Sequence, residues 1–163
     1  MEINSIKNMY ISKLQELVSD ELQLGGIFLH LEEAASRPAL KKMFGKQRQQ
    51  AEVHKSKLES ILRAHSAGSI TYVDRAMVAL VRETKKMAAI IEEDELRDVG
   101  LIASAQKLKH YEIAAYGAVI NLAGQLGLRG DPELLQGFVE EEKKADTLFT
   151  DLAKQKLNRE AVV

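Results

Sequence analysis

The chain has 163 residues, of which 45% are hydrophobic and 5% aromatic, and it contains only 2 prolines and 10 glycines. Its length suits one domain with a sizeable core, and its composition favours helices over strands. With 23 basic and 24 acidic side chains, the chain has no excess of positive charge, so nucleic acid and anionic membranes are not expected partners.

Cysteine is absent, which excludes disulfides, thiolate metal sites and a rubredoxin-type electron donor within the chain. The first ten residues, MEINSIKNMY, lack the basic and apolar regions of a signal peptide. No apolar run approaches the ~20 residues that are needed to cross a bilayer. We therefore expect a soluble, cytoplasmic protein that does not contact membranes.

Apolar residues recur at spacings of three and four along most of the chain, which is the pattern of amphipathic helices. This pattern predicts five helices, at about 5–35, 38–65, 73–93, 95–126 and 132–157. Pro38 and Pro132 each fit the first turn of a helix, where proline is tolerated. The acidic run EEDELRD (92–98) ends the third helix, and GLRGDP (127–132) is the clearest turn in the chain.

Short turns make the first and second helices one antiparallel hairpin, and the fourth and fifth helices another. The third helix then connects the two hairpins. The expected fold is all-α, an antiparallel four-helix bundle with an additional crossover helix, in a single domain over residues 1–160. Apolar residues lie on more than one face of the crossover helix, and they predict a symmetric homodimer: Met77, Val81, Met87, Ile90 and Ile91.

Four polar residues interrupt the apolar stripes of the long helices, one on each helix: Glu21, His54, Glu112 and Glu142. Gln50 lies one helical turn before His54. Asp146 lies one turn after Glu142, and residues four apart share a helix face. Counted from the two hairpin turns, all six positions fall at about the same depth in the bundle. Glu140 and Glu141 belong to a charge run that is expected to face solvent.

Carboxylates gathered in one dry layer repel one another, and each unpaired buried charge costs several kcal/mol. A pair of divalent cations removes this cost, and a histidine among the ligands suits iron, manganese or zinc. The six residues therefore predict a di-iron site, or its manganese or zinc equivalent, that is only partly occupied. The alternative is a non-catalytic bundle whose polar layer fixes the register of the helices without metal.

Four stretches of the chain carry recognisable motifs: DELQL (20–24), AQKLKHYEIAAYG (105–117), QLGL (125–128) and EEEKKADTLFTDLA (140–153). They resemble the YciE/YciF family of bacterial stress-induced ferritin-like proteins, and the similarity covers nearly the whole chain. The resemblance implies a rubrerythrin-like bundle, usually dimeric, with a di-iron site and a role in stress. An oxidase or peroxide-consuming activity is the corresponding expectation, with an unknown redox partner.

By motif match, four positions correspond to the carboxylates of this family: Glu21, Glu112, Glu142 and Asp146. The family typically has glutamate in place of Gln50, glutamine in place of His54, and often glutamate in place of Lys109. Imidazole is a normal iron ligand, whereas the neutral amide of Gln50 is a poor replacement for a bridging carboxylate. The ammonium of Lys109 can neutralise the carboxylates without metal, in a network with Gln50.

Overall fold

The computed structural model describes residues 3–68 and 72–155, and within these ranges it contains five α-helices and no β-strand. The helices are α1 (Ile6–Ala34), α2 (Pro38–Ala64), α3 (Arg75–Ile90), α4 (Asp94–Gln125) and α5 (Gly130–Ala153). The all-helical prediction is confirmed for this part of the chain. The last two residues of the predicted fifth helix, 156 and 157, lie outside the described residues.

Helix α3 is shorter than the sequence predicts, because one side chain caps the start of α3 and another caps the start of α4. Asp74 begins α3 by accepting hydrogen bonds from the backbone nitrogens of Ala76 and Met77. Glu93 begins α4 in the same manner, with its side chain bound to the backbone nitrogens that follow. An extended segment therefore separates α3 from α4, where the sequence alone predicted continuous helix up to about residue 93.

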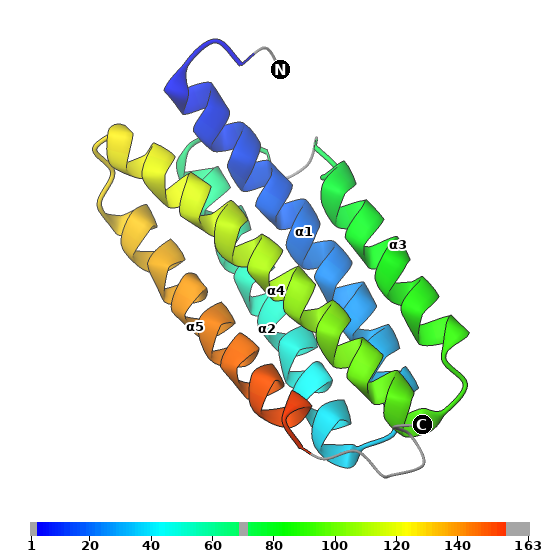
Figure 1. The fold of residues 1–163 in the computed structure, drawn as a ribbon. Helices are drawn as coiled ribbons and strands as arrows, with labels where there is room; N and C mark the ends of the chain where they lie inside the picture. Colours follow the sequence, from blue (N-terminus) through cyan, green and yellow to red (C-terminus); the bar gives the residue numbers. More distant parts are fainter. Residues whose placement is uncertain (1–2, 69–71, 156–163) are drawn as a thin grey trace.

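Figure 1 shows that α1 runs along α2 and that α4 runs along α5, so that each pair forms a hairpin. The two hairpins meet through contacts of α1 with α4 and of α2 with α5. Helix α3 lies against α1 and α4 and connects the hairpins. In the described residues, no helix has both the length and the apolar character that a membrane span requires.

The α1–α2 turn is held by a carboxylate from another helix. Asp98 of α4 is fully buried, and its oxygens accept hydrogen bonds from Ser36 N (2.7 Å), Ser36 Oγ (2.7 Å) and Arg37 N (2.9 Å). Burial alone would raise the pKa of Asp98, but the hydrogen bonds from Ser36 and Arg37 outweigh it and lower that pKa. This contact ties the first hairpin to α4 at one end of the molecule.

Two apolar clusters fill the interior, one toward each end of the hairpins. The cluster nearer the α1–α2 turn includes Phe28, Leu31, Phe44, Leu101 and Phe149. The cluster nearer the α4–α5 turn includes Tyr10, Leu14, Leu58, Tyr116 and Phe138. Along each long helix, buried polar residues separate the members of the two clusters, and they include Glu21, His54, Glu112 and Glu142. The interior is therefore divided by a polar layer at mid-height.

Candidate functional site

A buried lysine lies in this layer. Lys109 of α4 is only 2% exposed, and its Nζ lies 2.9 Å from Glu112 Oε2 and 2.6 Å from Glu142 Oε2. The same ammonium lies 4.8 Å from the centroid of the Phe28 ring. Burial alone would lower the pKa of Lys109, but the two carboxylates outweigh it and raise that pKa. Lys109 is therefore positively charged at neutral pH.

The charge of Glu112 is only partly compensated. Burial raises its pKa well above the usual value, the charge of Glu142 raises it further, and only Lys109 opposes the shift. Its Oε1 is buried and has no hydrogen-bond partner among the described residues. A buried acceptor without a partner costs roughly 1–3 kcal/mol, so this oxygen is a source of strain in the layer.

His54 of α2 contacts carboxylates through both ring nitrogens. Its Nδ1 lies 3.2 Å from Glu21 Oε1 and 3.6 Å from Glu142 Oε1, and its Nε2 lies 2.7 Å from Glu141 Oε2. Burial would lower the pKa of His54, but these carboxylates outweigh it and raise that pKa. Because only the imidazolium form donates from both nitrogens, this geometry favours a charged His54.

Tyr116 of α4 completes the layer by donating its hydroxyl hydrogen to Glu21 Oε1. Burial raises the pKa of Tyr116. Burial also raises the pKa of Glu21, and the contact with His54 partly counteracts that second shift. The ring of Phe138 stacks on the imidazole of His54 with centroids 4.0 Å apart, and it closes the layer from one side. We call the six buried polar residues the buried network: Glu21, His54, Lys109, Glu112, Tyr116 and Glu142.

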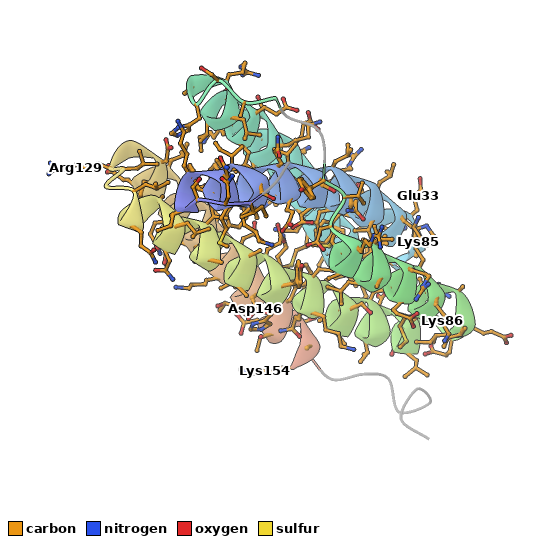
Figure 2. The ribbon with its side chains drawn as sticks, turned by 90° about the horizontal axis from the view of Figure 1, so that it is seen from above. Glu33, Lys85, Lys86, Arg129, Asp146 and Lys154 are labelled. Carbon is orange, nitrogen blue, oxygen red and sulfur yellow. The ribbon has the colours of Figure 1, made fainter. Side chains whose placement is uncertain are left out.

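Four of the six predicted metal ligands lie in the buried network: Glu21, His54, Glu112 and Glu142. The other two make different bonds. Gln50 donates to Glu141 Oε2 at 3.0 Å at the edge of the layer. Asp146, labelled in Figure 2, accepts a hydrogen bond from Gln106 at 3.2 Å and lies 3.4 Å from the exposed His110. Metal ligation by these residues stays a prediction.

Sequence reasoning missed the part that Glu141 plays. The Glu141 side chain is 52% exposed, as its charge run suggests, yet the carboxylate binds both His54 and Gln50. Its position gives a weak signal, because Glu141 lies three residues after the buried Phe138 and four before the buried Ala145. It therefore stands at the margin of the buried face of α5, where a long side chain reaches inward.

The side chains as arranged do not fit a centre of two metal ions. The Lys109 ammonium occupies the position between Glu112 and Glu142 where a cation would bind. Gln50 and Asp146 are engaged elsewhere. Within residues 3–68 and 72–155, no group of three or more His, Asp or Glu side chains is arranged to hold a metal ion.

Comparisons with known proteins agree over nearly the whole chain. The family model named DUF892, described as a domain of unknown function, matches residues 5–162. Protein YciF of Escherichia coli K12 is 34% identical over 162 residues, which are 99% of this chain and 98% of that protein. The crystal structure of the E. coli stress protein YciF covers 93% of this chain and 96% of that chain, with a TM-score of 0.88.

A second solved structure shows the same fold at lower similarity. YcfI from Rhodopseudomonas palustris is 22% identical, covers 96% of this chain and 98% of that chain, and has a TM-score of 0.89. This likeness concerns the fold alone.

Proposed function

This chain belongs to the DUF892 family, and from that premise we propose that it is a ferritin-like stress protein whose buried network holds the helices in register without metal. The ferritin-like arrangement is supported by the two hairpins and by α3 as their connection. The role in stress is supported by the similarity to the E. coli stress protein YciF. In this proposal the protein acts through its surface and its assembly, and it does not catalyse a reaction.

The position of Lys109 carries the metal-free part of the proposal. Its ammonium lies within 2.9 Å of two buried carboxylates that come from α4 and α5. It therefore supplies, on a covalent stem, the positive charge that a metal would otherwise supply. A divalent cation that entered this position would be repelled by the ammonium and would have to displace it.

The contacts of the buried network explain how it would fix the register. Lys109 joins α4 to α5, Tyr116 joins α4 to α1, and His54 joins α2 to both α1 and α5. A slide of any one helix by a turn would leave buried charges without partners. Breaking one buried ion pair costs about 3–5 kcal/mol, so the alternative registers are strongly disfavoured.

A metal-dependent stress protein with oxidase or peroxide-consuming activity is the second candidate. The observation that favours it is the buried Glu112 Oε1, which has no hydrogen-bond partner in the described part of the chain. Glu21, His54 and Glu142 lie in the same layer. These side chains would hold a metal only after Lys109 had moved away from Glu112 and Glu142.

The metal content of protein purified without a chelator separates the two candidates. We expect wild-type protein to hold less than about a tenth of an ion per chain, and its melting temperature to be unchanged by Fe(II), Mn(II), Zn(II) or EDTA. The double variant Lys109→Glu/Gln50→Glu should gain metal, because it replaces the ammonium and the amide by carboxylates.

Lys107→Glu is the matched control, since Lys107 is exposed on the same helix and the charge change is the same as at Lys109. This variant should remain free of metal. About one or two ions per chain in wild-type protein, with anomalous scattering at the buried network, would establish the second candidate instead.

A further inference from the structure

A second group of carboxylates lies outside the buried network, in a groove between α1 and α4 beside the start of α3. The cavity there has a volume of about 240 Å³. Its polar lining comes from two helices and the residue before α3: Lys13, Glu16 and Asp20 of α1, Asp74 before α3, and Tyr111 of α4. The rest of the lining is mostly apolar, and includes Leu17 together with three alanines of α4.

Asp20 is the least compensated of these carboxylates. The residue is 2% exposed and lines the cavity, and its Oδ1 is buried without a hydrogen-bond partner among the described residues. Burial raises the pKa of Asp20 to about 9, and the charges of Asp74, Glu21 and Glu16 add to the shift. The nearby cation is Lys13, whose Nζ lies 2.6 Å from Glu16 Oε2. Lys13 also lines the cavity, but its ion pair is with Glu16, and no cation in the part of the chain that the structure describes forms an ion pair with Asp20 or Asp74.

Asp74 is held rigidly at the same end. Its Oδ1 caps α3 by accepting from Ala76 N at 2.8 Å, and its Oδ2 accepts the hydroxyl hydrogen of Tyr111. These bonds fix the carboxylate in place while leaving its negative charge uncancelled. The carboxyl groups of Asp20 and Asp74 thus form a fixed acidic end, and the alanines of α4 form an apolar wall beside it.

The chemistry of this lining selects one class of ligand. A metal ion is disfavoured, because the described residues contain no group of three carboxylates or histidines arranged to bind one, and because both Asp74 oxygens are already engaged. An ammonium group needs only acceptors in its vicinity, and a short carbon chain gains from contact with alanines. The cavity has room for roughly eight groups the size of water, at ~30 Å³ each, which suits a very small molecule.

We propose that this cavity binds a small aliphatic amine, with its ammonium group between Asp20, Asp74 and Glu16 and its carbon chain against Leu17 and Ala118. This site is separate from the buried network, and the proposal does not depend on whether that network holds metal.

Calorimetric titration with putrescine at neutral pH tests the proposal, with butanol as a neutral analogue of similar length and MgCl₂ as a control for ionic strength. We expect saturable binding of putrescine with a dissociation constant of about 1 mM or tighter, and no binding of butanol or Mg²⁺ at the same concentrations. Because its pKa is about 9, Asp20 is mostly protonated at neutral pH and releases its proton when the ammonium group binds. Asp20→Asn should therefore weaken putrescine binding by about tenfold or more, because the amide cannot ionise. Ala118→Leu should weaken it by filling the cavity.

Asp151→Asn is the matched control, because it removes a carboxylate from an exposed position of α5. It should bind putrescine as wild-type protein does. Circular dichroism of each variant shows that the fold is kept. Equal affinity in wild type and Asp20→Asn, absence of saturable binding, or a preference for Mg²⁺ over putrescine would each overturn the proposal.

Discussion

Lys109 Nζ of α4 lies 2.6 Å from Glu142 Oε2 of α5, and both side chains are almost completely buried. This ion pair crosses from one helix of the second hairpin to the other. It stands between two apolar clusters, where water does not screen it. Removing one partner would leave the other as an uncompensated buried charge, which lowers the free energy of unfolding.

Lys109→Met should therefore destabilise the protein strongly. The variant leaves Glu112 and Glu142 facing each other without a cation, so we expect the free energy of unfolding to fall by about 3–5 kcal/mol. Urea denaturation at neutral pH measures this change. The double variant Lys109→Met/Glu142→Gln should recover part of the loss, because it also removes one of the stranded charges. If Lys109→Met were as stable as wild type, the ion pair between Lys109 and Glu142 would not contribute to stability.

Replacing Asp98 should cost stability in a pH-dependent manner. Since the folded state lowers the pKa of Asp98, its contribution is present above the unfolded pKa of about 3.9 and is lost as the pH falls through the lower folded pKa. We expect Asp98→Asn to reduce the free energy of unfolding by about 1–3 kcal/mol at pH 7. The difference from wild type should shrink below about pH 4, as seen in urea titrations across this range.

His54 should produce the opposite pH dependence. The folded state raises the pKa of His54, so its contribution is complete below the unfolded pKa of about 6.5 and is lost as the pH rises through the folded pKa. Wild-type stability should therefore decline above about pH 6.5 more steeply than that of His54→Gln. The imidazole proton resonances of His54 measure its folded pKa directly. A folded pKa of His54 below the value of about 6.5 for unperturbed histidine would contradict this prediction.

Tyr116→Phe isolates the hydrogen bond to the buried Glu21 carboxylate. Loss of a donor to a buried charge should lower the free energy of unfolding by about 1.5–3 kcal/mol. Tyr10→Phe is the matched comparison, since the Tyr10 hydroxyl donates to the partly exposed Asp131 at 2.8 Å. This second variant should lose only about 0.5–1.5 kcal/mol in the same denaturation experiment. Equal losses would mean that burial of the acceptor does not matter here.

The predicted homodimer can be tested at the exposed side of α3. Met77 faces the core and is fully buried, whereas Val78 and Ile90 are 42% and 62% exposed. Light scattering at micromolar concentration should give the mass of a dimer, and Ile90→Glu should shift it toward the monomer mass. Lys86 is exposed on the same helix (Figure 2), and Lys86→Glu should leave the mass unchanged. A wild-type monomer would contradict the prediction.

The helices and the burial of four polar residues could be read from sequence because both depend on local periodicity. Glu21, His54, Glu112 and Glu142 replace apolar residues in stripes that a helix must bury, so their place in the interior follows from the 3.6-residue repeat. Helix ends do not follow from the repeat alone, as α3 shows, because side-chain caps such as Asp74 compete with the continuing pattern.

The partners of these residues depend on how neighbouring helices are rotated and spaced, which no single helix pattern contains. Four residues along a helix turn it by about 400°, so Gln50 and Asp146 stand about 40° away from the residues that they accompany. That offset places Gln50 beside Glu141 and Asp146 beside Gln106, away from the layer. The pairing of Lys109 with Glu142 likewise depends on the packing of α4 on α5, because that packing sets the gap that the long lysine side chain spans. In the low dielectric of this interior, the attraction between the two charges is stronger than it would be in water.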